Sequence, residues 1–160
     1  MPKDTNIIHV YTDGSARGNP GPAGWAAIFL YKGKVFEMGG GSEHATNNQM
    51  ELTGPIEALK YLHKNKIKLE VEFFSDSKYV ILGITEWILG WKKNGWRNAA
   101  KKQVLNRELW EELDALVAAY KPKWNYVKGH NENEWNERAD EIATSFADKT
   151  VTKLRQDKIF

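Results

Sequence analysis

The chain has 160 residues, of which 41% are hydrophobic, so its length and apolar content suit one domain around one core. It contains no cysteine, which excludes a disulfide framework and a thiolate zinc site. The formal net charge of +2 indicates no class of partner, and no apolar run is long enough for a signal peptide or a membrane span, so we expect a cytoplasmic protein.

The first part of the chain predicts a meander of three strands. Alternating apolar residues mark strands over 7–13, 24–31 and 34–41. The sequence GNPGPAG predicts the first turn, and Lys32 with Gly33 predicts a hairpin. These strands therefore pair in an antiparallel manner.

After the meander, helices alternate with strands. Helical spacing of apolar residues begins near residue 46 and continues to about 64. The later elements that we predict are a strand over 69–75, helices over 77–93 and 106–120, a strand over 123–127 and a helix over 132–147. This order predicts an α/β fold in which two parallel strands extend the meander into a five-stranded mixed sheet flanked by helices.

The domain prediction covers residues 1–160, with a core over about 7–147. We expect the tail of 148–160 to be partly disordered, because it mixes charges with little periodicity.

Four acidic residues lie where carboxylates can converge. Asp13 and Asp76 each end an apolar strand, and ligands of α/β sheets bind beyond the carboxyl ends of strands. Glu51 and Asp140 border the apolar faces of their predicted helices. Each acid alone has a plainer interpretation as a turn former, a helix cap or a solvated carboxylate. Together they would repel one another unless divalent cations bound them, and Mg²⁺ prefers oxygen ligands of this kind.

The segment 87–107 is basic and aromatic. It has no acidic residue, and three tryptophans lie among its six basic residues. Trp87 is our candidate for a contact with nucleic acid, whereas Trp91 and Trp96 are expected to pack at the base of this segment. Lys92 and Lys93 suit phosphate groups.

Five blocks in this order and spacing resemble bacterial ribonuclease HI: TDGSARGNPGPAGWAAI, TNNQMEL, SDSKYV, the GWKKNGW region and VKGHNENEWNERADE. The resemblance covers residues 7–147. It implies the ribonuclease H-like fold and endonucleolytic cleavage of the RNA strand of RNA/DNA hybrids, which leaves a 3′-hydroxyl and a 5′-phosphate. The implied partner is the hybrid duplex, and neither a membrane nor an obligate protein partner is expected for what we take to be a monomer.

The same resemblance implies the site. Asp13, Glu51, Asp76 and Asp140 would hold two Mg²⁺ ions, with Mn²⁺ as an alternative. His130 would assist activation of the nucleophile or release of product, although a loop histidine is by itself usually solvated.

The resemblance also implies the residues that bind substrate. The amides of Asn19, Asn47 and Asn48, together with Lys78, would face the RNA strand, where Lys78 replaces a glutamine that is common in the family. Thr46 and Asn106 would bind a phosphate of the DNA strand, although Leu105 departs from the basic residue often found there. From the residues alone, Asn19 could equally form the turn, and Asn47 or Asn48 could cap the helix.

Gly54 and Pro55 fall inside the helix that carries Glu51. Because an interior proline removes a helix hydrogen bond at a cost of about 3 kcal/mol, we expect a bend near Glu51.

Two other functions stay open. One is a non-catalytic module that binds hybrids, against which the four acids argue. The other is a different nuclease of the same fold, against which the basic tryptophan-rich segment and the KGH loop argue.

Overall fold

The computed structural model describes residues 6–128 and 133–159. In chain order the elements are β1 (Ile7–Ala16), β2 (Gly21–Tyr31), β3 (Lys34–Ala45), α1 (Asn47–Lys64), β4 (Glu70–Ser75), α2 (Lys78–Leu82), the π-helical turn η1 (Gly83–Trp87), α3 (Ile88–Lys93), α4 (Arg107–Tyr120), β5 (Lys123–Tyr126) and α5 (Glu134–Ala147). Within the described part of the chain, no helix is long and apolar enough to cross a membrane.

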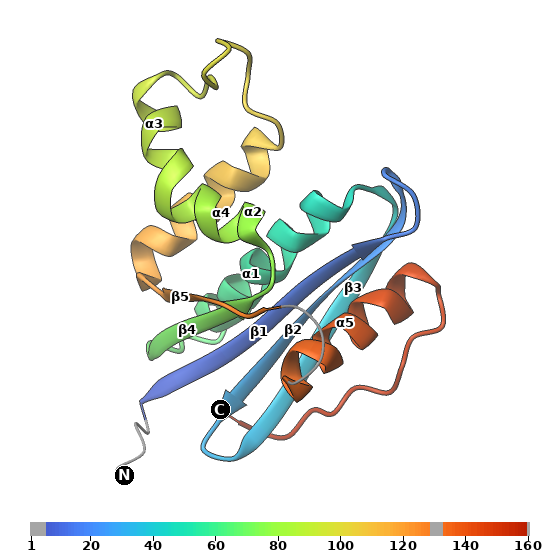
Figure 1. The fold of residues 1–160 in the computed structure, drawn as a ribbon. Helices are drawn as coiled ribbons and strands as arrows, with labels where there is room; N and C mark the ends of the chain where they lie inside the picture. The colour runs from blue at the N-terminus through green and yellow to red at the C-terminus, as the bar shows by residue number, and fades with distance from the viewer. Residues whose placement is uncertain (1–5, 129–132, 160) are drawn as a thin grey trace.

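The strands form one mixed sheet in the order β3-β2-β1-β4-β5 (Figure 1). β1 and β3 both pair with β2 in an antiparallel manner. β4 lies parallel to both β1 and β5. The predicted five-stranded mixed sheet is therefore confirmed.

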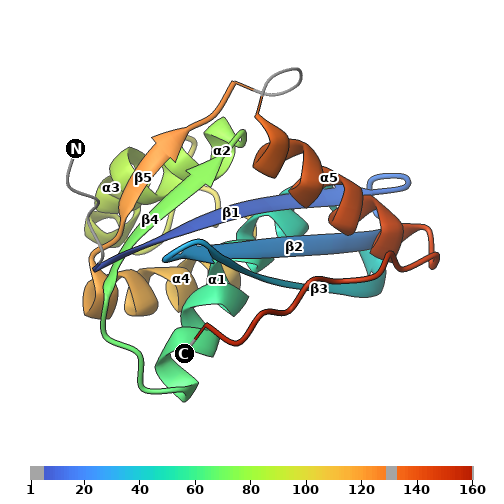
Figure 2. The same cartoon turned by 90° about the horizontal axis from the view of Figure 1, so that it is seen from below.

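Side chains alternate between the two faces of the sheet and fill a larger and a smaller core, beside a small cluster of Ala23, Ala45 and Met50. Val10 and Phe29 belong to the larger core, which also contains the apolar faces of α1 and α4. Tyr11 and Ile28 belong to the smaller core under α5. Figure 2 shows α5 on the opposite side of the sheet from α1 and α4. Residues carried by α5 therefore approach the strand ends from a different side than residues of α1.

The predicted helix over 77–93 is divided into α2, η1 and α3. The π-helical turn begins at Gly83, and a Cβ there would overlap the ring of Trp110, which is fully buried. The missing side chain therefore leaves room for that ring.

α1 continues without interruption through Gly54 and Pro55 to Lys64, and the bend expected near Glu51 stays a prediction. Both residues are buried. A Cβ on Gly54 would lie 3.1 Å from Cβ of Thr12 and 3.1 Å from the carbonyl oxygen of Ala26. The glycine therefore lets α1 lie close to β1 and β2, a packing requirement that the sequence pattern did not reveal.

The tail also differs from the expectation of partial disorder. Its described residues return along the edge strand β3, where Gln156 forms an antiparallel bridge with Phe36. The N–H of Asp157 donates to the carbonyl of Val35, and the N–H of Val35 donates to the carboxylate of Asp157. Backbone and carboxylate hydrogen bonds hold this segment against the sheet edge. Such contacts require no apolar periodicity, so the sequence pattern did not reveal them.

Candidate active site

Asp13 lies in β1 and is 7% exposed. Its Oδ1 accepts a hydrogen bond of 2.9 Å from the N–H of Gly14. A Cβ on Gly14 would lie 2.8 Å from Cβ of Met50 and would overlap the backbone at Glu51. Gly14 thus permits the contact between β1 and α1 that brings Glu51 beside Asp13.

Asp76 reaches the same place through the parallel pairing of β1 and β4. Tyr11 pairs with Phe74, and the two acids each follow two residues later on neighbouring strands. Ser77 then donates from its hydroxyl to Oε1 of Glu51 at 3.0 Å, and its Oγ accepts from the N–H of Val80 to cap α2. Ser77 therefore orients the carboxylate of Glu51.

One carboxylate oxygen from each of Asp13, Glu51 and Asp76 lies within 4.8 Å of the other two. Burial, followed by the charge of Asp76, raises the pKa of Asp13 well above its usual value. Burial also raises the pKa of Glu51 to about 6, with a further contribution from Asp76 and an opposing one from the Ser77 hydrogen bond. Three crowded, partly desolvated oxygens fit a hard divalent cation, because its charge would offset their repulsion.

Asp140 is an exposed residue of α5. Its charge contributes to the raised pKa of Asp13, so it lies within electrostatic range of the cluster. The set of three ligand atoms within 4.8 Å does not include it. The structure thus brings three of the predicted acids into contact range and places the fourth nearby, on the other side of the sheet. His130 lies outside the described residues.

The predicted polar residues gather at the start of α1. Thr46 is the N-cap, and it exchanges hydrogen bonds with Gln49 in a capping box. The side chain of Asn19 accepts from the N–H of Asn47 at 3.1 Å. Asn48 is exposed. Asn19 and Thr46 therefore have structural roles, which remain compatible with contacts to a ligand.

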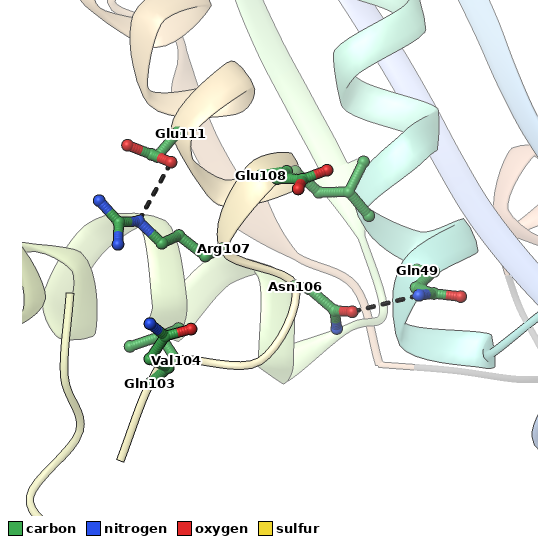
Figure 3. Close-up of a pocket in the computed structure, with 8 residues that line it drawn as sticks. Gln49, Gln103, Val104, Asn106, Arg107, Glu108 and Glu111 are labelled. Carbon is green, nitrogen blue, oxygen red and sulfur yellow. Dashed lines mark hydrogen bonds and ion pairs between the residues drawn. The ribbon is translucent and has the colours of Figure 1, made fainter. Parts of the chain in front are cut away.

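Asn106 lies beside this group, at a cavity of about 590 Å³ that is lined by Gln49 of α1, by the chain before α4 and by the start of α4 (Figure 3). Its Oδ1 accepts from Gln49 at 3.3 Å, and its Nδ2 donates to the Tyr79 hydroxyl at 3.1 Å. The backbone of Asn106 is left-handed, with φ of 61°. Leu105 before it is 81% exposed.

The basic segment of 87–107 projects from the sheet as Trp87, α3 and the chain that leads to α4 (Figure 1). Trp87 is 40% exposed, and its ring contacts those of Tyr79 and Trp91. Trp91 and Trp96 pack against the larger core, as expected. Lys92 and Lys93 are both exposed, and Lys92 forms an ion pair of 3.0 Å with Asp114.

Lys78 is exposed, and its ammonium lies 5.4 Å from the centre of the Tyr126 ring. Tyr126 is 48% exposed and pairs with Ser75, the residue before Asp76. The sequence interpretation missed Tyr126, Ser77 and the packing role of Gly14. Ser77 follows a predicted ligand directly, and that adjacency was the signal that could have identified it.

Comparison with known proteins agrees with this geometry. The family model described as RNase H matches residues 5–148. The "Ribonuclease H" of Bradyrhizobium diazoefficiens is 51% identical over 137 residues, which cover 86% of this chain and 87% of that protein. The "Ribonuclease HI" of Pseudomonas syringae pv. tomato is 46% identical over 145 residues, which cover 91% and 95%.

Two solved structures have the same fold. LC9-RNase H1, described as a type 1 RNase H with the type 2 active-site motif, has a TM-score of 0.82 at 26% identity and covers 99% of this chain and 81% of its own. LC11-RNase H1, solved in complex with an RNA/DNA hybrid, has a TM-score of 0.65 at 29% identity and covers 91% and 99%. The chain belongs to the ribonuclease H family, as its sheet order and its carboxylate cluster indicate.

Proposed function

We propose that this protein hydrolyses phosphodiester bonds within the RNA strand of RNA/DNA hybrids and leaves 3′-hydroxyl and 5′-phosphate ends. The observation that carries the proposal is the cluster of Asp13 within β1, Glu51 in α1 and Asp76 directly after β4. Family membership supports it, as does the hybrid bound by LC11-RNase H1.

The proposed cofactor is Mg²⁺, bound as two ions during catalysis, with Mn²⁺ as a substitute. Asp13, Glu51, Asp76 and Asp140 would hold it through carboxylate oxygens. When bound, divalent cations of this kind activate a water molecule and stabilise the leaving oxygen of a phosphodiester.

The protein's own groups orient these ligands. The N–H of Gly14 holds the carboxylate of Asp13, and the hydroxyl of Ser77 holds that of Glu51. Because the pKa of Glu51 is about 6 in the metal-free protein, protons compete with cations at acidic pH. We assign to His130 the transfer of a proton near the water nucleophile or the product.

We propose that the hybrid lies across the N-terminus of α1 and along the basic segment. Asn19, Asn47, Asn48 and Lys78 would contact the RNA strand, where amides can recognise 2′-hydroxyls. Thr46 and Asn106 would hold a phosphate of the DNA strand. Trp87 would pack on a deoxyribose of the same strand, and Lys92 and Lys93 would neutralise its phosphates.

The test uses an end-labelled RNA/DNA hybrid with Mg²⁺, beside single-stranded RNA, RNA duplex and DNA duplex. We expect internal cuts only in the RNA strand of the hybrid, abolished by a chelator and by Asp13→Asn. Glu112→Gln, which removes an exposed carboxylate in α4, is the control and should leave cleavage unchanged. Cutting of the other duplexes would indicate a different nuclease of this fold. Binding of hybrid without cutting would indicate a non-catalytic binding module.

A further inference from the structure

Glu37 is a buried carboxylate in the edge strand β3, and it is 2% exposed. Its Oε2 accepts from Nε of Arg138 at 2.7 Å, and its Oε1 accepts from Nη2 at 2.8 Å. The N–H of Arg155 also donates to Oε1 at 2.7 Å. Although burial raises the pKa of Glu37, these hydrogen bonds hold it below its usual value. Glu37 and Arg138 therefore form a bidentate ion pair between β3 and α5.

Residues of the C-terminal tail also form hydrogen bonds with Glu37 and Arg138. The Nη2 of Arg138 donates to the carbonyl of Lys153 at 2.8 Å. The N–H of Glu37 donates to the carbonyl of Arg155 at 2.8 Å, and the side chain of Gln156 donates to the carbonyl of Glu37 at 2.9 Å. We call Glu37, Arg138 and residues 153–156 the β3–α5 lock. It joins three segments that are far apart in the sequence.

The β3–α5 lock lies close to Asp140 along the helix, because Arg138 precedes that acid by two residues. The other three acids come from β1, from α1 and from just after β4, whereas the hydrogen bonds of the lock join β3, α5 and the tail. The position of Asp140 relative to them therefore depends on how α5 lies on the sheet. Gly24 and Gly39 let the helix lie close, since Cβ atoms there would overlap Ala143 and Phe146.

Apolar packing at Gly24 and Gly39 sets how closely α5 lies on the sheet. A planar guanidinium that forms two parallel hydrogen bonds with one carboxylate also constrains the orientation of α5 relative to β3, because such hydrogen bonds are directional. Ion pairs of this kind contribute little net stability, because burying both charges costs about as much as their attraction returns. The main effect of the lock is therefore on the orientation of α5 rather than on the stability of the protein.

We propose that the β3–α5 lock is a positioning device, which sets the place of Asp140 relative to Asp13 and thereby the affinity of the site for divalent cations. This rests on the proposed function, in which Asp140 is a metal ligand. Arg138 and the tail act through Asp140 and contact neither substrate nor cation.

The first test compares Arg138→Lys with the parent. Lysine keeps the charge but cannot form both hydrogen bonds. We expect the Mg²⁺ concentration for half-maximal cleavage to rise about 10-fold to 100-fold, the range found when groups that orient metal ligands are lost. We expect the KM for hybrid to stay within about twofold. Calorimetric titration of Mg²⁺ into the protein without substrate should show the same weakening.

Lys149→Met is the matched control. It removes another cation that follows α5 and pairs with a residue of β3, but that pair with Glu43 is largely exposed. Its cation affinity should equal that of the parent. Truncation after residue 152 should reproduce the effect of Arg138→Lys, because it removes the tail's part of the lock.

A double-mutant cycle separates positioning from stability. If Arg138 acts through Asp140, then Arg138→Lys weakens cation binding in the parent but adds nothing in an Asp140→Asn background. Equal weakening in both backgrounds would overturn the proposal. So would a variant that unfolds at lower urea concentration while binding Mg²⁺ like the parent. If instead Asp140→Asn binds Mg²⁺ and cleaves hybrid as the parent does, the metal assignment in the proposed function fails.

Discussion

Burial of the Glu51 carboxylate, with a smaller contribution from the charge of Asp76, destabilises the metal-free protein at neutral pH, and Glu51→Gln should reveal by how much. The difference between a pKa of about 6 in the folded chain and the ordinary 4.5 corresponds to about 2 kcal/mol of unfolding free energy. Glutamine keeps an acceptor for the Ser77 hydroxyl but carries no charge. We therefore expect Glu51→Gln to stabilise the metal-free protein by about 2 kcal/mol at pH 7.5, or about 4–8 °C in Tm.

The sign of the pH dependence follows from the direction of the pKa change. Between pH 4.5 and about 6.5 the unfolded chain loses the Glu51 proton while the folded chain still retains it. The stabilising contribution of the protonated side chain is therefore full below pH 4.5 and is lost as pH rises through 6. At pH 4 the variant and the parent should differ by less than about 0.5 kcal/mol.

Urea unfolding in a chelator at pH 4 and at pH 7.5 measures both quantities. Glu86→Gln, at an exposed position of η1, controls for the loss of one negative charge. Added Mg²⁺ should stabilise the parent more than Glu51→Gln, because the cation offsets the cost of a buried, repelled charge that the variant no longer carries. If Glu51→Gln raised the free energy of unfolding equally at both pH values, or did not raise it at pH 7.5, the reasoning would be refuted.

Other consequences can be measured separately. Asp13→Asn should lower kcat for hybrid cleavage by more than about 100-fold and remove most of the Mg²⁺-induced rise in Tm, since losing a ligand costs more than losing a group that orients one. Trp87→Ala should weaken hybrid binding by about 1–3 kcal/mol in a filter-binding or fluorescence assay, and unchanged affinity would remove it from the interface. Lys93→Gln should reduce the slope of log Kd against log salt by about 1, and Lys92→Gln by less, because Lys92 is already paired with a carboxylate. Gly83→Ala should lower the midpoint of urea unfolding by more than the roughly 1 kcal/mol that alanine adds to a helix, because its Cβ overlaps a buried indole ring; equal midpoints would contradict this packing argument.

The sequence was sufficient for the sheet and for most of the acid cluster. Period-two alternation predicts the strands, and because β1 and β4 are parallel neighbours, two acids that follow equivalent positions must lie side by side. Glu51 was harder to place from the pattern alone, because only the contact of α1 with Gly14 brings it to those strands.

The position of the tail along β3 could not be predicted from the sequence pattern. Its residues show no apolar periodicity, because they bind the edge of β3 through backbone groups and through the carboxylate of Asp157. The same holds for the packing at Gly54 and Gly83, where a missing side chain matters only in relation to a neighbour that is distant in the sequence.

Local patterns of apolar and polar residues thus determined the fold, the positions of the acids along the chain and the chemistry that those acids suit. The tertiary structure alone decided that Ser77 holds Glu51, that Lys92 is paired whereas Lys78 lies over Tyr126, and that α5 is tied to β3 by Glu37 and Arg138. The physical reason is that periodicity records which face of an element is buried, whereas a hydrogen bond or an ion pair between distant segments depends on register and on the angle between elements.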